Sequence, residues 1–375
     1  ITDKATEKNA GLQYVETFTN SAEFGIISQR DFFDRDIAKL GSLDGYYIVK
    51  NEDFVYNPRI STSAPVGPIN RNKLGRTGVM SPLYTVFRPH DIDTTYLEYF
   101  FKCGYWHSFM NFNGDSGARS DRFSIRDNVF FQMPIPIPDI DEQRKIGELL
   151  TCLDNLITLH QRKFEKLTNV KKSILEKMFP RNGSSYPEIR FKGFTDPWEQ
   201  RKFGEVATFI NGRAYSQPEL LSSGKYKVLR VGNFYTNDSW YYSDLELGEK
   251  YYADYGDLLY TWSATFGPHI WLGDRVIYHY HIWKISLSDQ LEKQFAVQLL
   301  EQDRANILSS KNGSTMVHIT KEGMEQKDVI IPPSTKEQQK IGAFFSQLDD
   351  LITLHQRELE KLQSIKKALL EKMFV

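Results

Sequence analysis

A stretch of basic side chains is the clearest sign of chemistry in this sequence. From Asn57 to His90 it contains no Asp or Glu and five basic residues, which are Arg59, Arg71, Lys73, Arg76 and Arg88. Lys and Arg side chains bind nucleic-acid phosphates, and Arg also reads guanine edges. The whole chain carries a net charge of −1, so we expect a nucleic acid to be bound at a local site rather than over the whole surface.

Motifs of the common enzyme classes are absent from the sequence. It contains no GxxxxGKS/T phosphate loop, no glycine-rich dinucleotide fingerprint, no HExxH and no GxSxG. The tripeptide Asn57-Pro58-Arg59 departs from the NPPY-type motif of amino-methyltransferases. We therefore expect no catalytic residue and no bound cofactor in this chain.

Histidines and cysteines give little support for a metal site. His279 and His281 would lie on one face of a strand, but no third ligand is evident, so structural histidines are favoured over metal ligands. Cys103 and Cys152 lie outside any CxxC pair, which favours a reducing, cytoplasmic setting. No apolar run approaches the roughly 18 residues of a membrane helix.

The elements that must position the basic side chains are organised by a repeat. The 38 residues 142–179 return as residues 337–374, at a constant offset of 195 and with 24 identical positions. Such a repeat indicates two structural units in tandem, each ending in the same long helix. Asp139 and Glu142 have the spacing of a capping box at the start of the first helix, and Ser334 and Glu337 repeat it at the second.

Apolar residues recur every three or four positions in both copies, which is typical of a coiled-coil seam. We expect the two helices to pack antiparallel against each other, and each to be about 57 Å long at 1.5 Å per residue. The residues expected to pair the helices are Leu149, Leu153, Leu156, Phe164 and Leu167 in the first copy, and Phe344, Leu348, Leu351, Leu359 and Leu362 in the second.

The segments outside the repeat differ more from each other but share an outline. Short aromatic and β-branched runs predict strands: GYYIV, DFVYN and PLYTVF in the first half, KYKVLRV, DLLYTW and HYHIWKI in the second. A helix-like stretch and a glycine-containing polar loop follow in each. The predicted fold class is therefore α+β, with two mixed α/β domains (residues 1–140 and 181–336) alternating with two long helices (residues 141–180 and 337–375).

One segment of the second half has no counterpart in the first. It is PEIRFKGFTDPWEQRKFGEV, from Pro187 to Val206, just before the first strand of that half. Counted back from the matched strands DFVYN and DLLYTW, the first half is shorter by about this length. We therefore expect that a matching N-terminal segment is missing from the first domain or was never ordered.

The whole plan resembles the DNA-specificity (S) subunit of type I restriction–modification enzymes. The motifs that carry the resemblance are the tandem helices EQRKIGELLTCLDNLITLHQRKFEKL and EQQKIGAFFSQLDDLITLHQRELEKL, the proline-rich entries MPIPIPDIDEQ and IIPPSTKEQ, and PEIRFKGFTDPWEQRKFGEV. The resemblance implies that each variable half is a target-recognition domain for one half of a split, double-stranded DNA site. It also implies that the helices act as a spacer and dock two methyltransferase subunits, which restriction subunits can join. Catalysis and S-adenosylmethionine binding would belong to those partners.

The resemblance and the residue types together give a set of candidate DNA contacts. An ordinary surface role is the alternative for each of them, because recognition domains differ in the bases they read. The candidates in the first half are Arg59, Asn70, Arg71, Lys73, Arg76, Ser116 and Arg119. The candidates in the second half are Asn211, Arg213, Trp262, Ser263, Thr265, His269, Lys311 and Ser314.

The predicted target is asymmetric and bipartite, because the two halves differ in sequence. We expect half-sites about 34 Å apart, one helical turn of DNA, with the helices setting the unread spacer. Two other function classes stay open on the sequence alone. One is a protein–protein scaffold with two variable binding domains, and the other is an enzyme, such as a nuclease, with an unrecognised site.

Overall fold

The computed structural model describes residues 1–34, 40–116, 121–181, 183–235, 237–263, 265–309 and 319–374. These residues form two compact units. Unit 1 consists of Ile1–Gln161 with Arg357–Val375, and unit 2 consists of Arg162–Gln356. Each unit therefore contains one globular domain together with part of both long helices. None of the helices in the described parts of the chain is long and apolar enough to cross a membrane.

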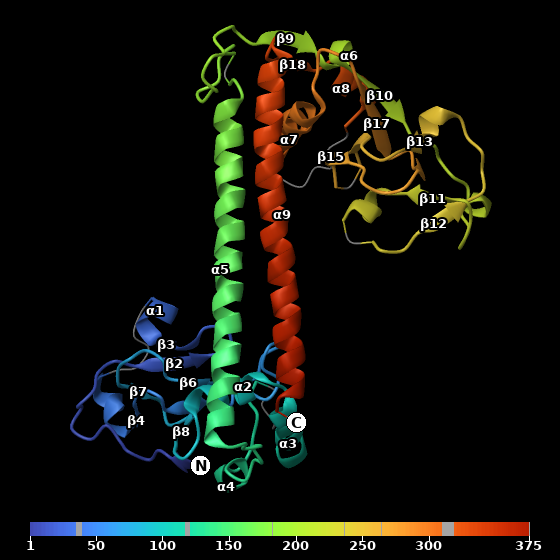
Figure 1. Cartoon of the computed structure of the whole chain (residues 1–375). Coiled ribbons are helices and arrows are strands. Elements are labelled where there is room, and N and C mark those ends of the chain that lie inside the picture. Colours follow the sequence, from blue (N-terminus) through green and yellow to red (C-terminus); the bar gives the residue numbers. More distant parts are fainter. Residues whose placement is uncertain are drawn as a thin grey trace. The chain divides into compact units, whose positions relative to one another are not determined.

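Unit 1 is built on a four-stranded antiparallel sheet in the order β1-β8-β5-β6, beside two strand pairs, β2-β3 and β4-β7. Its strands are β1 (Thr2–Lys4), β2 (Phe18–Ser21), β3 (Gly25–Ser28), β4 (Tyr47–Val49), β5 (Phe54–Tyr56), β6 (Ile69–Arg71), β7 (Gly78–Met80) and β8 (Thr85–Pro89). Its helices are α1 (Gln29–Phe33), α2 (Thr94–Lys102), α3 (Tyr105–Asn113), α4 (Asp127–Phe130) and the first part of α5 (Ile140–Met178), with a 3-10 turn at Leu40–Gly45 (Figure 1).

Unit 2 repeats this plan with the sheet β10-β17-β14-β15 and adds the sheets β12-β11-β16-β13 and β18-β9. Its strands are β9 (Glu199–Lys202), β10 (Ala207–Asn211), β11 (Tyr226–Leu229), β12 (Tyr241–Ser243), β13 (Tyr252–Ala253), β14 (Leu258–Thr261), β15 (Gly267–Ile270), β16 (Val276–Tyr278), β17 (Ile282–Leu287) and β18 (Asp328–Ile331). Its helices are α6 (Phe203–Val206), α7 (Lys293–Ser309), α8 (Lys321–Glu325) and the first part of α9 (Thr335–Lys372), with 3-10 turns at Gln217–Glu219, Val231–Phe234 and Glu249–Tyr251.

The predicted long helices are present and run antiparallel within each unit (Figure 1). In unit 1 the ammonium of Lys366 on α9 pairs with Asp154 on α5. In unit 2 Lys171 on α5 pairs with Asp349 on α9 at 2.5 Å. At the offset of 195, Asp154 corresponds to Asp349 and Lys171 corresponds to Lys366. The same ion pair is therefore formed twice, with the roles of the two helices exchanged.

Three of the ten residues expected in the helix seam are exposed instead of packed. Leu149, Leu156 and Leu351 are 44%, 37% and 45% exposed, so the prediction was wrong for them. The inward positions are taken by Leu150, which is fully buried, and by half-buried side chains such as Ile157. The reason is that each long helix also packs on a globular domain, which turns the buried stripe away from a strict seam. The other seven are buried or half-buried, namely Leu153, Phe164, Leu167, Phe344, Leu348, Leu359 and Leu362.

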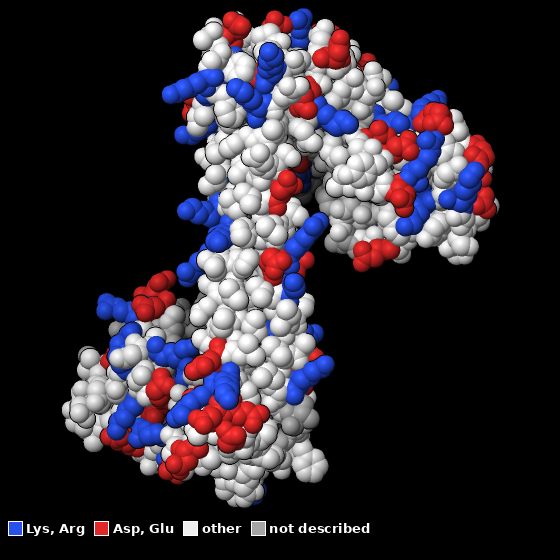
Figure 2. Space-filling view, viewed as in Figure 1, with Lys and Arg blue, Asp and Glu red and all other residues white. Residues whose placement is uncertain are grey.

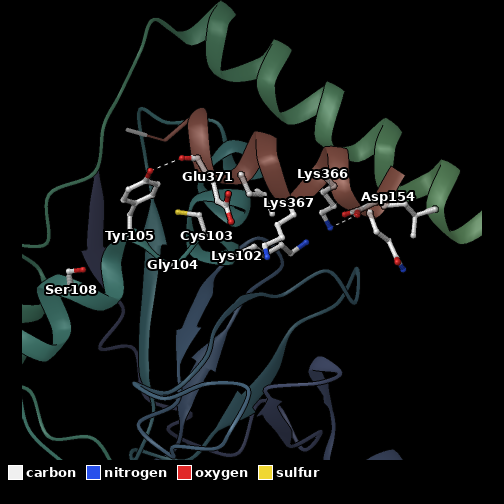
Figure 3. A pocket seen from close by; sticks show the side chains of 12 residues that line it. Lys102, Cys103, Gly104, Tyr105, Ser108, Asp154, Lys366, Lys367 and Glu371 are labelled. Atoms are coloured by element: carbon white, nitrogen blue, oxygen red, sulfur yellow. Dashed lines mark hydrogen bonds and ion pairs between the residues drawn. The ribbon is translucent and has the colours of Figure 1, made fainter. Parts of the chain in front are cut away.

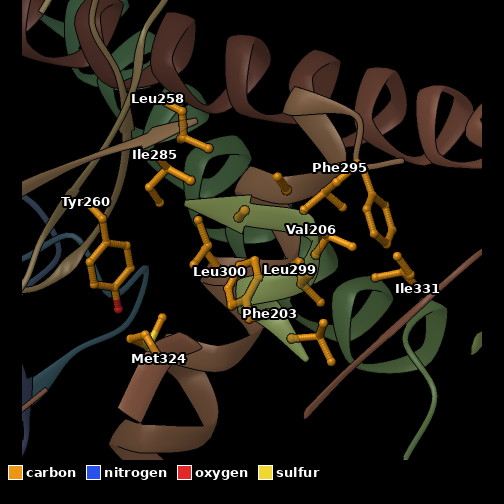
Figure 4. Packing of buried hydrophobic residues seen from close by; sticks show 14 of the residues in the cluster. Phe203, Val206, Leu258, Tyr260, Ile285, Phe295, Leu299, Leu300, Met324 and Ile331 are labelled. Carbon is orange, nitrogen blue, oxygen red and sulfur yellow. The ribbon is translucent and has the colours of Figure 1, made fainter. Parts of the chain in front are cut away.

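Each domain has its main core where a helix of the domain meets the long helices. In unit 2 the sheet side chain Leu258 and the α7 side chains Phe295 and Leu300 pack in one cluster with Ile341 of α9 (Figure 4). In unit 1 the equivalent cluster joins Phe54, α2 and the α5 side chain Leu150. Burial of such side chains is the main stabilising term of a domain, at roughly 1.5–3 kcal/mol for each.

A glutamine of each long helix holds the start of the domain helix. Gln143 of α5 accepts a hydrogen bond from the backbone N–H of Asp93 at 2.9 Å, and Asp93 caps α2. Gln338 of α9 accepts one from the backbone N–H of Glu292 at 2.8 Å, just before α7. Both glutamines are about 2% exposed or less. These equivalent contacts fix each domain to the long helix at the same place.

One turn further along each long helix, a glycine lets the long helix and the domain helix approach each other closely. A Cβ at Gly342 would lie 2.7 Å from the Cβ of Gln294 and 2.8 Å from the backbone nitrogen of Phe295. A Cβ at Gly147 would lie 3.2 Å from the side chain of Thr95. The repeated sequence EQ-x-KIG is therefore the junction between each domain and its long helix.

Candidate nucleic-acid interface

The candidate residues of unit 2 gather at one end of its main sheet. β10 ends at Asn211, β14 ends at Thr261 and β17 begins at Ile282, and the antiparallel pairing places these termini together. The backbone beyond β10 passes very close to the connection between β16 and β17: a Cβ at Gly212 would lie 2.3 Å from the carbonyl oxygen of His279. Only glycine fits there, so this turn places the residues that follow it at the end of the sheet.

Arg213 lies in this turn and is held by neighbouring side chains. Its guanidinium is 2.6 Å from a carboxylate oxygen of Glu219 and 5.1 Å from the centre of the Tyr215 ring. The hydrogen bond from Arg213, followed by those from Ser216, lowers the pKa of Glu219 to about 2. The side chain of Arg213 is 30% exposed, and its Nη1 is buried without a hydrogen-bond partner among the described residues.

Aromatic side chains form much of the same end of the sheet. Trp262 stacks on Trp283 with ring centres 5.8 Å apart, and its indole N–H donates to the carbonyl oxygen of Tyr280 at 2.9 Å. Tyr280 and Tyr235 are 39% and 42% exposed. Ser263 follows Trp262 directly and is half-buried. Exposed aromatic rings at such an edge can stack on bases or pack on a DNA backbone.

His269 lies beside these aromatic residues on β15. It stacks on Phe234 with ring centres 4.1 Å apart, and its Nε2 is 3.1 Å from the hydroxyl oxygen of Tyr235. Burial, followed by the charge of Arg304, lowers the pKa of His269 to about 4. His269 is therefore neutral near pH 7 and can offer DNA hydrogen bonds but no positive charge. Thr265, on the connection before β15, is exposed.

In unit 1 the equivalent end of the sheet carries arginines. The turn after β5 places Arg59 in a backbone bridge with Arg122, and both side chains are exposed. Asp115 and Ser124 form a second bridge, which brings the exposed Ser116 to the same loop cluster. Neither arginine has an ion pair within the described part of the chain. Arg59 and Arg122 are therefore free to contact phosphates or guanine edges.

The other basic residues of the acid-free stretch meet carboxylates from elsewhere in the sequence. Arg71 is 9% exposed and lies 2.6 Å from Glu98 and 3.0 Å from Glu52, while Lys73 also contacts Glu98. Arg76 forms two hydrogen bonds of 2.8 Å with Glu16. Arg88 binds Asp53 in the same two-bonded manner. The stretch contains no acidic residue in sequence, but the fold brings carboxylates to four of its five basic side chains.

The side chain of Asn70 also forms hydrogen bonds within the fold. Its amide donates to the side-chain oxygen of Asn20 at 2.7 Å and to the carbonyl oxygen of Ser21 at 3.1 Å. These bonds hold the β2-β3 hairpin against the sheet. Figure 2 shows basic and acidic side chains interspersed over unit 1 on the face drawn, without a continuous basic surface. Arg119, Lys311 and Ser314 lie outside the described residues.

A cavity of about 670 Å³ in unit 1 lies away from the end of the sheet (Figure 3). Several of its polar side chains are engaged in the fold: Lys366 pairs with Asp154, and the Tyr105 hydroxyl donates to the carbonyl oxygen of Glu371 at 2.6 Å. The thiol of Cys103 bonds a backbone carbonyl, and burial raises its pKa. These contacts support the junction of α9 with the domain rather than a chemical step. No group of His, Cys, Asp and Glu side chains among the described residues could hold a metal ion.

Sequence reasoning did not find Arg122, Tyr235, Tyr280 or the two junction glutamines. Arg122 lies two residues beyond the polar loop Asn113–Ser120, and only the fold brings it to Arg59. The glutamines did have a signal, because Gln143 and Gln338 are identical at the offset of 195 and lie on an otherwise polar first turn. An invariant polar residue at both copies of a buried junction is typical of a hydrogen-bonding role.

Comparison with known families adds to this geometry. A family model described as the type I restriction modification DNA specificity domain matches residues 36–169 and 195–364. The chain is 24% identical over 263 residues to the type I restriction enzyme MjaVIII specificity subunit of Methanocaldococcus jannaschii, covering 64% of this chain and 61% of that protein. It is 24% identical over 259 residues to a putative MjaX specificity subunit of the same organism, covering 66% and 60%. The chain thus matches about three fifths of the length of these curated relatives.

Solved structures confirm the fold. The type I restriction–modification S subunit from M. genitalium superposes with a TM-score of 0.59 at 14% identity, covering 100% of this chain and 93% of that one. A chain from a study of complex assembly and conformational transition in a type I R–M system gives a TM-score of 0.52 at 16% identity, covering 87% and 83%. The predicted combination of two mixed domains with two long helices is therefore confirmed. The family description favours DNA specificity over a scaffold without DNA.

Proposed function

Because the chain belongs to the family of type I restriction–modification DNA specificity domains, we propose that it is the DNA specificity subunit of such a complex. Each unit reads one half of an asymmetric, bipartite target on double-stranded DNA. The observation that carries this proposal is the contrast at the equivalent sheet ends. Unit 1 presents Arg59 where unit 2 has Ser263, on the same strand frame and the same long helices.

The two sheet ends would read DNA by different chemistry. The fork of Arg59, supported by Arg122, suits the O6 and N7 acceptors of guanine or two phosphates. Unit 2 offers the partly exposed Arg213, neutral His269 and exposed aromatic edges. Two unlike half-sites follow from this difference. Each well-formed bidentate contact would contribute about 1–3 kcal/mol of discrimination.

The exposed leucines of the long helices are the proposed docking surfaces for two methyltransferase subunits. Unit 1 presents Leu156 and Leu159, which are 37% and 45% exposed. Unit 2 presents their equivalents at the offset of 195, Leu351 and Leu354, which are 45% and 50% exposed. An apolar pair in the sequence LITLH that is repeated on each unit suits two copies of one partner, since each copy would meet the same residues.

Membership of the specificity-domain family supports a division of functions among the subunits of the complex. This chain would be non-catalytic, and the methyltransferase subunits would bind S-adenosylmethionine and transfer the methyl group. Restriction subunits could join the complex. The length of the two helices would set the number of unread base pairs between the half-sites.

Methylome sequencing tests the proposal. The chain is co-expressed with its cognate methyltransferase subunits in a host without other adenine methylation, and modified adenines are mapped by long-read sequencing. We expect one asymmetric motif made of two specified half-sites and a fixed spacer. A stable complex with no methylated bipartite motif would contradict the DNA-reading proposal.

Insertion of one helical turn at matched positions of α5 and α9 tests the spacer role. We expect the spacer to change while both half-sites stay the same. Altered half-sites with an unchanged spacer would refute this part of the proposal.

Stoichiometry tests the docking surfaces. We expect native mass spectrometry to find two methyltransferase subunits on the wild-type chain and one on L159E or L354E. The double variant should bind none, whereas substitution of the exposed Glu148 by Gln should leave two. Two subunits bound to the double variant would show that the leucine pairs are not the docking sites.

A further inference from the structure

One arginine of the globular domain in unit 2 has no carboxylate to balance its charge. This residue is Arg230, which directly follows β11, the strand that pairs with β12 (Figure 1). The other arginines between residues 181 and 336 each lie within 3.4 Å of a carboxylate oxygen, namely Arg181, Arg190, Arg201, Arg213, Arg275 and Arg304. Arg230 forms no ion pair within the described part of the chain.

An aromatic ring holds the guanidinium of Arg230 instead. The guanidinium carbon lies 4.2 Å from the centre of the Tyr241 ring on β12. The side chain is half-buried, and its Nε is buried without a hydrogen-bond partner. Nη1 and Nη2 are not buried, and they form no hydrogen bond among the described residues, so they face solvent. Because stacking on a ring fixes the plane of a guanidinium, Arg230 presents two free donors side by side in a fixed plane.

The backbone around Arg230 is also held by the protein itself. Its N–H donates to the side-chain oxygen of Asn233 at 3.0 Å, which closes the turn Val231–Phe234. The amide of Asn233 in turn donates to the carbonyl oxygens of Asn237 and Ser239, each at 3.0 Å. The connection that carries Arg230 is therefore tied at both ends before any DNA is bound, which lowers the entropic cost of binding.

This connection borders the candidate interface of unit 2. The backbone carbonyl just before Arg230 accepts a hydrogen bond from the N–H of His279 at 2.9 Å, and His279 forms a backbone bridge with Arg213. Arg213 and Arg230 thus lie on either side of one extended run. The turn after Arg230 ends at Phe234, whose ring stacks on His269 with ring centres 4.1 Å apart.

The neighbours of Arg230 leave its positive charge uncompensated. Burial, followed by repulsion from His281 and Arg230, lowers the pKa of His279 to about 4, so His279 is neutral near pH 7. Arg213 is the other guanidinium at this end of the sheet, but it binds Glu219 at 2.6 Å and its Nη1 is buried. Arg230 is therefore better placed than Arg213 to contact a strong hydrogen-bond acceptor outside the protein.

We propose that Arg230 is a specificity-determining residue of unit 2, whose Nη1 and Nη2 donate to the O6 and N7 atoms of one guanine in the half-site of that unit. This inference rests on the proposed DNA-reading function and adds a base and the group that reads it. The two guanine acceptors lie in the plane of the base, so they need two coplanar donors. Stacking on Tyr241 supplies that plane, which a contact to a single phosphate oxygen would not require.

Methylome sequencing of R230A tests the assignment in the complex with the methyltransferase subunits. We expect one guanine position of one half-site to accept other bases, while the rest of the motif and the spacer stay unchanged. R275A is the matched control, because Arg275 also lies 4.2 Å from a tyrosine ring, that of Tyr252, but is paired with Glu249 at 2.7 Å. R275A should keep the wild-type motif.

The outcomes separate this inference from the proposed function. A wild-type motif that persists in R230A would overturn the inference alone. If methylation then becomes weaker at every site, Arg230 contacts a phosphate rather than a base. A wild-type complex without any methylated bipartite motif would contradict the proposed function itself.

A base analogue tests the contact on the wild-type protein, so the result does not depend on the folding of a variant. Each guanine of the target duplex is replaced in turn by 7-deazaguanine, which lacks the N7 acceptor, and binding of the complex is measured by fluorescence anisotropy. We expect the affinity to fall about tenfold at one guanine. R230M keeps an apolar stem on Tyr241 and should lose this sensitivity. Equal affinity at every guanine, or sensitivity retained in R230M, would overturn the proposal.

Discussion

Glu142 and Glu337 occupy the same place in two copies of one helix, yet their surroundings differ completely. Glu337 is buried against Arg190, whereas Glu142 is exposed to solvent. The identical residue is a structural anchor in unit 2, whereas in unit 1 its carboxylate has no ion pair among the described residues. The comparison teaches that a repeated sequence preserves the possibility of a contact, and that the contact itself depends on what the neighbouring segment supplies.

Removing the arginine of the buried pair should produce the largest difference between the units. R190A leaves the carboxylate of Glu337 buried without a partner, so we expect unit 2 to lose about 3–5 kcal/mol of unfolding free energy. E142A should change unit 1 by less than about 0.5 kcal/mol, because the side chain is exposed. Denaturant unfolding followed by tryptophan fluorescence reports mainly on unit 2, since it holds Trp198, Trp240, Trp262, Trp271 and Trp283. Similar losses from R190A and E142A would break the comparison.

The junction glutamines should behave alike in both units, in contrast to the two glutamates. Q143L and Q338L each leave a buried backbone N–H without its acceptor, at Asp93 and Glu292. We expect each to cost about 1–3 kcal/mol in its own unit. Hydrogen exchange in α2 and α7 would measure the two effects separately. A large effect in only one unit would show that the two junctions are not equivalent.

Substitution of the two junction glycines by alanine should change the stability of the two units by amounts that differ less. In G342A the new methyl group meets backbone at 2.8 Å, so overpacking should exceed the gain in helix propensity and cost about 1–2 kcal/mol. In G147A the nearest atoms are side-chain atoms at 3.2 Å, and the two effects should nearly cancel. Thermal unfolding of the two variants measures the difference. Greater destabilisation by G147A would contradict the tighter packing assigned to unit 2.

The pH dependence of the unfolding free energy of unit 2 should contain a further small contribution from His269. Its folded pKa is about 4, below the ordinary value of 6.5. The unfolded chain therefore takes up the proton first as the pH falls below about 6.5, and the stability that neutral His269 provides is progressively lost down to about pH 4. We expect about 1 kcal/mol of this loss between pH 7 and about pH 5.7, and H269Q should reduce it. An unchanged slope in H269Q would show that His269 is not buried in its neutral form.

The architecture could be predicted from the sequence because it is carried by local signals. Repeat length, caps and apolar spacing place both long helices within three residues of α5 and α9. The strands around Phe54 and Leu258 follow from short aromatic and β-branched runs. Such signals depend on residues close together in the chain.

The candidate site could be predicted only in part because it depends on distant partners. Arg71 and Arg76 look available in sequence, but Glu98 and Glu16 reach them through the fold. Arg59 keeps its place in the candidate set, and Arg122 joins it only through a backbone bridge. Contacts between distant residues also explain the error in the predicted helix seam. Packing of the long helices on the domains leaves Leu156 exposed.

The separate reading of two half-sites by two units can be measured directly. Methylome sequencing is carried out with the wild-type chain and with the double variant R59A/R122A, each co-expressed with the methyltransferase subunits. We expect the variant to lose base discrimination in one half-site, while the other half-site and the spacer stay unchanged. Equal loss in both half-sites, or an unchanged motif, would contradict the assignment of one half-site to unit 1.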